Sequence, residues 1–210
     1  MTTLAYLTQK YNLDLTQPSP IEIPNVGRNN LVFWLQELDF KVGVEVGVAE
    51  GAYSEIICKA NPQMQVYGID PWLDYVNYNV YTKTNELSNM YNLASKRLAS
   101  YSNYKIIRAF SMDAVIRFQD NSLDFIYIDA NHQEPYITQD ITEWFKKIKP
   151  GGIIAGHDYI RLKRTVCHVI NAVNSYTTSN NIKPWFLLGL NAKIPGTIRD
   201  NSRSWMWIKP

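Results

Sequence analysis

The sequence predicts an α/β protein with a doubly wound, mostly parallel, seven-stranded sheet that has an antiparallel edge strand and helices on both faces. Two observations favour this fold class. Short β-branched runs alternate with helical patterns from residue 41 to about residue 176, an order that builds parallel strands with crossover helices. The last two apolar runs are separated only by the loop-like stretch "LNAKIPGTIRDN", so we expect them to form a closing hairpin with an antiparallel strand.

The expected strands are short apolar runs bounded by turn residues or by charged residues. "KVGVEVGV" is rich in β-branched valine, and "MQVYGID" ends on an acid. "SLDFIYID" also ends on an acid, after a run that is almost entirely apolar or aromatic. The strands are expected at residues 41–48, 64–70, 104–110, 122–129, 151–158, 183–189 and 202–210.

The expected helices have apolar residues at intervals of three and four. The clearest series begins at Ile137 and ends at Ile148, and Pro135 stands at its start, where proline is favoured. A second series begins at Leu87 and ends at Leu98. The helices are expected at residues 29–38, 50–60, 85–101, 112–118, 135–149 and 164–176.

Two segments show no regular pattern. Residues 1–30 are expected to form an irregular arm or cap, because "QPSPIEIPNVG" places three prolines within seven residues. Residues 71–84 are rich in Tyr and Asn without a clear period, and we interpret them as a loop or lid. We therefore expect a single domain over residues 1–210, with its core at 41–176 and closing strands in 177–210.

The composition is that of a globular protein and demands no charged macromolecular partner. Hydrophobic residues make up 46%, charged residues 19%, and the formal net charge is +2. The only cysteines, Cys58 and Cys167, fit no metal spacing or disulfide framework, which favours reduced thiols in the cytoplasm. There is no signal-peptide pattern and no run of about 18 apolar residues. We expect a small-molecule partner rather than nucleic acid or a membrane, and the sequence does not indicate the oligomeric state.

Polar or glycine residues stand at the carboxyl ends of four expected strands. They are Gly47, Asp70, Asp129 and the pair His157–Asp158. In open parallel sheets, ligands bind outside the carboxyl ends of the strands. The sequence therefore predicts a binding site at this edge of the sheet.

The first strand-to-helix turn indicates what that site binds. Its glycines, Gly47 and Gly51, allow close backbone approach, but the third glycine of a dinucleotide-binding turn is absent. Glu45 and Glu50 would repel a pyrophosphate and suit a cationic amino-acid ligand. An ordinary tight turn without a ligand is also consistent with this pattern.

Two residues after the second expected strand are suited to a nucleoside. Asp70 follows Gly51 by nineteen residues and can accept the hydroxyls of a ribose, whichever cofactor carries it. A structural acid in the turn before Pro71 is the alternative. Trp72 would cover an adenine or form a wall of the core.

The pattern of acid, glycine and second glycine resembles motif I of the class I S-adenosylmethionine-dependent methyltransferases. The stretch "SLDFIYIDANHQEPYITQDITEWFKKIKPGGIIAGHDY" is similar to small-molecule O-methyltransferases of that class, which share I-D-x-x-H, an Asp-bearing helix, a Trp, K-P-G-G and G-H-D-Y. "RAFSMDAV" matches their S-x-x-A step after the third strand. The resemblance covers roughly residues 41–176 and implies a Rossmann-like core that binds S-adenosylmethionine.

The resemblance also implies roles for individual residues. Glu45, Gly47 and Gly51 would bind the methionine end of the cofactor, and Asp70 its ribose. Asp129 would hold the methionine amine or serve the acceptor. The adenine would be surrounded by Trp72, Ser111 and Met112, and the acceptor would be served by Asp129, His132, His157 and Asp158.

Three interpretations of the acidic rim remain open. Asp129, His157 and Asp158 offer oxygen and nitrogen ligands for a divalent metal, although His157 stands where the metal-dependent relatives have a carboxylate or amide. Alternatively, His132 or His157 is a metal-free general base that takes the proton of the acceptor. In the third interpretation, His132 caps the helix near Pro135 and the others bond loop backbone.

Two further polar residues fall within expected helices. His168 is interpreted as a packing or surface residue. Asp140 is either exposed to solvent or, as its place in the family pattern suggests, bonded to a loop near the site.

The function expected from these patterns is S-adenosylmethionine-dependent methylation of a small-molecule hydroxyl, such as that of a sugar or natural product. The alternatives are a nicotinamide- or nucleotide-sugar-dependent oxidoreductase, which the missing third glycine disfavours, and an inactive methyltransferase-like interaction module. Nucleic-acid methylation lacks support, because no N/D-P-P-Y/F motif follows the fourth strand.

Overall fold

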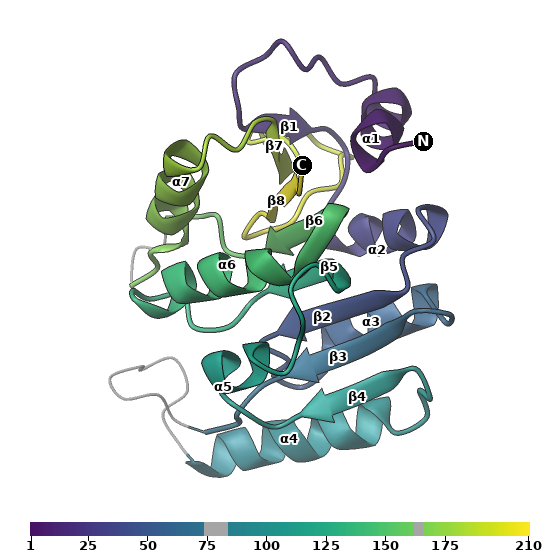
Figure 1. Cartoon of the computed structure of the whole chain (residues 1–210), viewed down its shortest axis with the longest axis vertical. Helices are drawn as coiled ribbons and strands as arrows, with labels where there is room; N and C mark the ends of the chain where they lie inside the picture. The colour runs from purple at the N-terminus through teal and green to yellow at the C-terminus, as the bar shows by residue number, and fades with distance from the viewer. Residues whose placement is uncertain (74–83, 162–165) are drawn as a thin grey trace.

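The computed structural model describes residues 1–73, 84–161 and 166–210 of the chain. Its centre is an eight-stranded sheet with the order β1-β7-β8-β6-β5-β2-β3-β4 (Figure 1). The strands are β1 (Ile21–Ile23), β2 (Val42–Val46), β3 (Gln65–Ile69), β4 (Tyr104–Ile107), β5 (Leu123–Ile128), β6 (Ile148–Gly156), β7 (Trp185–Leu188) and β8 (Trp205–Ile208).

The pairing confirms a mostly parallel sheet but moves its antiparallel strand. β8 runs antiparallel to both β6 and β7, and the other neighbouring strands pair in parallel. The expected hairpin of β7 and β8 is present. The prediction of seven strands with an antiparallel strand at the edge was wrong in detail, since β8 lies inside the sheet. The eighth strand, β1, pairs in parallel with β7 and covers the edge that β7 would otherwise expose.

Helices cover both faces of the sheet, as predicted. α5 (Ser111–Val115), α6 (Tyr136–Lys147) and α7 (Val169–Ser179) contribute to the apolar cluster on one face, and α6 lies in front of the sheet in Figure 1. α1 (Thr3–Tyr11), α2 (Arg28–Glu37) and α3 (Ala52–Ala60) contribute to the cluster on the other face. α4 (Thr84–Leu98) packs on α3 and forms a third, smaller cluster with Val48 and Trp72.

The N-terminal arm is more regular than the sequence indicated. Residues 3–11 form a helix whose N-cap, Thr2, accepts a hydrogen bond from the Ala5 amide at 3.2 Å. Leu7 is fully buried on this helix, so packing against the sheet layer stabilises a segment that is short for an isolated helix. The prolines that indicated an arm lie after the helix and flank β1.

Residues 74–83, which make up most of the predicted lid, lie outside the described part of the chain. In the described part, no helix combines the length and apolar character needed to cross a membrane.

Candidate active site

A cavity of about 530 Å³ opens at the carboxyl ends of β2, β3, β5 and β6. Its wall includes the glycine turn after β2, the start of α4 and the acidic residues after β5 and β6. Of the predicted site residues, the lining contains Glu45, Gly47, Asp70, Trp72, Ser111, Asp129, His132 and Asp158. The sheet edge predicted from the sequence is therefore where the cavity lies.

The glycine turn brings the end of β2 against the end of β5. Gly47 has a φ of +95°, and a Cβ atom there would lie 2.1 Å from the carbonyl oxygen of Asp129. Gly51 caps α3 with a φ of +75°, and its missing side chain leaves room for Leu98. Both positions require glycine because of backbone conformation and close contact together.

Asp70 stabilises this turn through hydrogen bonds to backbone amides. Its Oδ2 accepts hydrogen bonds from the amides of Val48 and Ala49 at 3.0 Å, and its Oδ1 accepts one from the amide of Trp72 at 2.8 Å. Burial raises the pKa of Asp70, although these three bonds oppose the shift. Asp70 is thus a structural acid of the turn, and its carboxylate still faces the cavity with lone pairs to spare.

Trp72 is both a wall of the cavity and part of the core. Its indole N–H donates to the Ala49 carbonyl at 2.8 Å, and its ring meets Tyr91 edge-on with centroids 5.0 Å apart. Because the side chain is only 2% exposed, it offers a fixed surface rather than a mobile cover.

Glu45 lies buried beneath the glycine turn. It accepts a short hydrogen bond from the hydroxyl of Ser54, which lies 2.9 Å from the hydroxyl of Tyr104. Burial raises the pKa of Glu45 to about 8, and the charge of Asp129 contributes to this rise. At neutral pH Glu45 therefore carries a proton unless a cation binds beside it.

Ser111 and Asp140 form a buried pair at the start of α5. The Ser111 hydroxyl donates to Asp140 and accepts a hydrogen bond from the Trp144 indole at 2.8 Å. Asp140 is 3% exposed, so the solvent-exposed alternative is wrong. Its partner Ser111 is the first residue of α5 and not part of a loop. Ser111 lines the cavity, whereas Met112 packs against the main apolar cluster and is not among the described lining residues.

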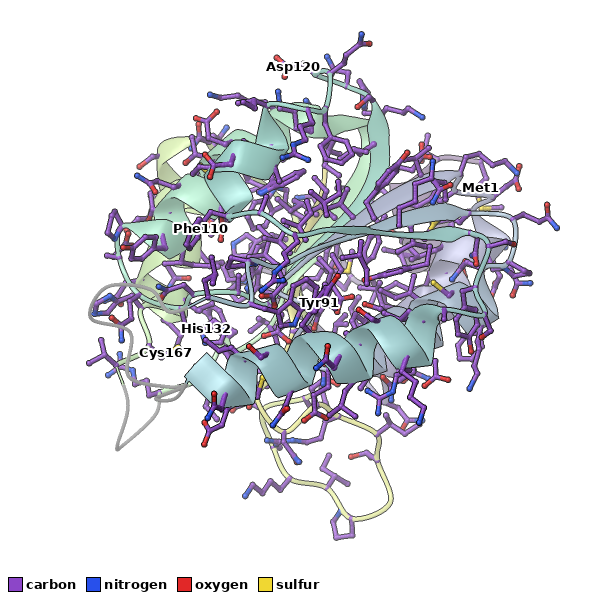
Figure 2. All side chains as sticks on the ribbon, turned by 90° about the horizontal axis from the view of Figure 1, so that it is seen from below. Met1, Tyr91, Phe110, Asp120, His132 and Cys167 are labelled. Atoms are coloured by element: carbon purple, nitrogen blue, oxygen red, sulfur yellow. The ribbon has the colours of Figure 1, made fainter. Side chains whose placement is uncertain are left out.

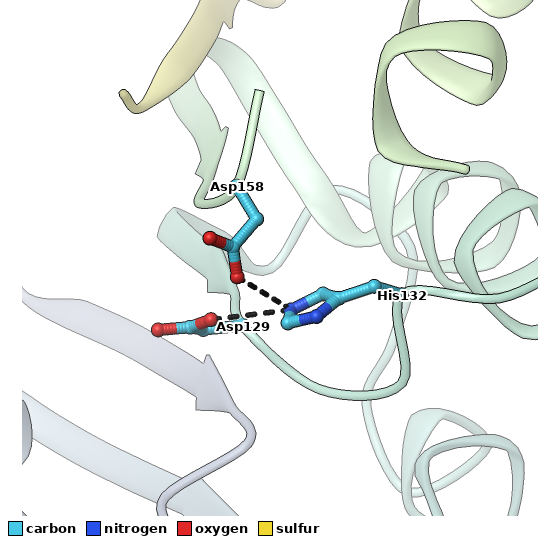
Figure 3. A group of neighbouring side chains, drawn as sticks. All are labelled: Asp129, His132 and Asp158. Carbon is cyan, nitrogen blue, oxygen red and sulfur yellow. Dashed lines mark ion pairs between the residues drawn. The ribbon is translucent and has the colours of Figure 1, made fainter. Parts of the chain in front are cut away.

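His132 lines the cavity and lies between the carboxylates of Asp129 and Asp158 (Figure 3). Its Nε2 is 3.4 Å from Oδ1 of Asp129 and 3.2 Å from Oδ2 of Asp158. The Nε2 atom is buried yet meets neither acid at hydrogen-bonding angles. Burial lowers the pKa of His132, but the two acids outweigh it and the net shift is upward. Burial alone would raise the pKa of Asp158, but His157 and His132 lower it by more, so the net shift is downward.

His157 stands at the margin of this group. Its Nδ1 is 3.8 Å from Asp129 and 3.5 Å from Asp158, and it is not among the described residues that line the cavity. Its backbone N–H bonds the Ile128 carbonyl, and its carbonyl accepts from the Trp205 indole. In the described residues, the atoms grouped closely enough for a metal, within 4.8 Å of one another, belong to Asp129, His132 and Asp158.

Comparison with known proteins identifies the family. Residues 44–159, more than half of the chain, match the family model of a methyltransferase domain. The chain belongs to this methyltransferase family. No curated protein sequence matches it.

Solved structures share the fold of this methyltransferase at low sequence identity. The O-methyltransferase TomG of Streptomyces achromogenes, solved with S-adenosylmethionine, has a TM-score of 0.60 at 14% identity, over 99% of this chain and 90% of that one. An O-methyltransferase of Bacillus cereus, solved with S-adenosylhomocysteine, has the same scores and coverage. Spermidine synthase of Thermotoga maritima has a TM-score of 0.55 at 12% identity, over 81% of this chain and 54% of that one.

One charged residue of the methyltransferase cavity, Arg28, was not predicted from the sequence. Arg28, the first residue of α2, donates from Nη1 to Oδ2 of Asp129 at 3.1 Å, and its guanidinium lies 5.0 Å from the centre of the Tyr53 ring. No local pattern in "NVGRNN" marks this residue, because only the tertiary fold brings it to the strand ends.

His168 has a structural place in the methyltransferase, as expected, although it precedes α7 instead of lying within it. Its Nδ1 accepts a hydrogen bond from the Glu134 amide at 2.9 Å, and its own amide donates to the His132 carbonyl at 2.8 Å. His168 therefore ties the loop that carries His132 to the start of α7.

The buried Asp140 makes the stability of the methyltransferase depend on pH. Burial raises the pKa of Asp140 from 3.8 to about 7, against the opposing hydrogen bond from Ser111. Between these values the unfolded carboxyl is ionised while the folded one is protonated, so the free energy of unfolding falls as pH rises. We expect Asp140→Asn to reduce the total fall in the free energy of unfolding by a few kcal/mol between about pH 4 and pH 7, as measured by urea unfolding.

Glu45 titrates over an overlapping range and provides the comparison for that measurement. Asp140→Asn retains an oxygen acceptor for the Ser111 hydroxyl, so the variant is expected to fold, and the slope that remains should come from Glu45. An unchanged slope in Asp140→Asn would show that Asp140 is ionised in the folded protein.

Proposed function

We propose that this methyltransferase transfers the methyl group of S-adenosylmethionine to a hydroxyl oxygen of a small molecule. The observation that carries the proposal is one cavity that joins the glycine turn of β2 to an acid–histidine group at the ends of β5 and β6. Two proteins of the same fold, solved with S-adenosylmethionine or S-adenosylhomocysteine, are O-methyltransferases, which supports both the cofactor and the oxygen acceptor.

The cofactor would lie across the glycine turn. The methionine end would lie beside Gly47 and Glu45, and Asp70 would face the ribose. Gly51 is not among the described lining residues, because Leu98 fills the space at this position, so its role would be to shape the turn. Trp72 and Ser111, which both line the cavity, would border the adenine. The acceptor oxygen would attack the methyl carbon, the bond from that carbon to sulfur would break, and S-adenosylhomocysteine would leave. Alignment of the two reactants supplies most of the rate in such a reaction.

The acceptor hydroxyl must lose its proton, and the residues of the rim are suited to this task. Asp129, His132 and Asp158 fit a divalent metal, since the buried Nε2 of His132 faces two carboxylates without a hydrogen bond to either. A bound metal would lower the pKa of a hydroxyl that it coordinates. If no metal binds, His132 is placed to take the proton itself, with two acids to stabilise its charge.

The other expectations agree with this proposal. Both cysteines are free in the structure, which supports the reducing cytoplasm as the location. A nicotinamide cofactor is disfavoured, because the turn lacks the third glycine of a dinucleotide-binding turn. An inactive interaction module is disfavoured, because the cavity keeps charged groups around an open volume.

Calorimetric titration with S-adenosylhomocysteine tests the proposal. We expect micromolar binding by the wild type and at least about tenfold weaker binding by Asp70→Asn, since a good charged hydrogen bond contributes about 1.5–3 kcal/mol. Asp120→Asn, at an exposed acid outside the cavity lining, is the matched control and should bind as the wild type does. Tight binding of NADH and none of S-adenosylhomocysteine would replace the proposal with the oxidoreductase.

A further inference from the structure

The amino-acid end of the proposed cofactor site contains a cation that its acids alone do not explain. S-adenosylmethionine ends in an ammonium and a carboxylate. Asp129 suits the ammonium, and Glu45 can ionise once that cation binds beside it, but an ionised acid would repel the carboxylate. Arg28 reaches the same part of the cavity wall, bonded to Asp129 and stacked over Tyr53.

Arg28 is held in place from three directions. Its amide donates to both carboxylate oxygens of Asp200, at 2.7 and 2.9 Å, and its carbonyl accepts from the Tyr53 hydroxyl at 3.0 Å. Asp200 lies in the connection between β7 and β8, the yellow loop that projects from the body in Figure 2. The backbone is thus fixed by groups that do not depend on the side chain, and the guanidinium meets Asp129 with 33% of the side chain exposed.

We infer that Arg28 binds the carboxylate of the cofactor's amino-acid end and selects the intact amino acid over its decarboxylated form. The inference rests on the proposed function. A guanidinium has five N–H donors in a planar fork that matches a carboxylate, so Arg28 keeps donors for a ligand while Nη1 holds Asp129. Arg28 and Asp129 then form a complementary pair for the zwitterion: the carboxylate meets the guanidinium and the ammonium meets the acid.

The test compares two ligands that differ only in the carboxylate. S-adenosylhomocysteine carries both charges, and S-adenosyl-3-thiopropylamine keeps the ammonium without the carboxylate. We expect the wild type to prefer the first by about tenfold or more in calorimetric Kd, as for loss of one charge-assisted contact. Arg28→Met should abolish this preference, and Arg28→Lys should keep part of it because the charge remains.

The ratio of the two Kd values distinguishes a specific role of Arg28 in carboxylate binding from a general loss of ligand binding. Arg117→Met removes the same charge from an exposed position and should leave the ratio unchanged. A wild type without preference, or Arg28→Met with the full preference, would overturn the role of Arg28. If the wild type binds neither ligand, the proposed function fails instead. If Arg28→Met melts far below the wild type, the test relies on the ratio of Kd values in Arg28→Lys. An undiminished preference in Arg28→Lys would contradict recognition of the carboxylate by the planar guanidinium.

Discussion

Gly47→Ala is expected to destabilise the protein by about 3 kcal/mol or more and to abolish binding of S-adenosylhomocysteine. The added Cβ would lie 2.1 Å from the Asp129 carbonyl oxygen and 2.8 Å from the Ala130 Cα, both of them backbone atoms that no side-chain rotation can move. The positive φ of +95° adds conformational strain. Relief requires β2 and β5 to separate at the cavity, so stability and ligand binding fall together. Urea unfolding and calorimetric titration measure the two effects.

Gly151→Ala separates the contribution of backbone conformation from that of the close contact. Gly151 also has a positive φ, of +80°, but a Cβ atom there would meet nothing within 4 Å. This variant should lose only about 1–2 kcal/mol and bind ligand as the wild type does. If Gly47→Ala lost no more stability than Gly151→Ala, the close approach of the two strand ends would not be a constraint on the turn.

The elements with a strong periodic pattern could be predicted from the sequence. β5 and α6 are examples, since a run that is apolar apart from Asp124 and a helical series from Ile137 to Trp144 are local properties of the chain. The order of strands at the closing edge could not be predicted. β8 lies between β6 and β7, and β1 pairs with the far side of β7 through only three residues of an otherwise proline-rich arm. These pairings join segments that are distant in sequence, so no local pattern indicates them.

The site divides in the same way. Residues at strand ends, such as Asp70 and Asp129, could be found because a parallel sheet places all carboxyl ends on one edge. Arg28 could not, because its place depends on where α2 begins and on the anchoring of its amide by Asp200, which is distant in sequence. The sequence placed His157, not His132, among the candidate metal ligands, whereas the described structure groups His132 with Asp129 and Asp158. This difference depends on side-chain direction, which the position of a residue along a strand does not specify.

His132→Ala is expected to weaken divalent-metal binding by about 100-fold or more, whereas His157→Ala should retain it within a few-fold. Removal of an outer-shell partner alone typically costs about 10–100-fold, and a direct ligand should cost at least as much. His132 Nε2 lies 3.4 Å from Asp129 and 3.2 Å from Asp158, close enough for the three groups to share one metal ion. His157 Nδ1 lies 3.8 Å from Asp129, and His157 is not among the described residues that line the cavity. Calorimetric titration with Mn²⁺ and with Mg²⁺ measures the affinities.

The two histidine variants are matched because their backbone roles survive truncation. The His132 carbonyl still accepts from His168, and the His157 amide still donates to the Ile128 carbonyl, so similar melting temperatures are expected. If only His157→Ala lost metal, the ligands would be Asp129, His157 and Asp158, as the sequence suggested. If the wild type bound neither ion, the metal interpretation would fail. Catalysis would then depend on His132 as a base, and the two acids that raise its pKa would be its positioning groups.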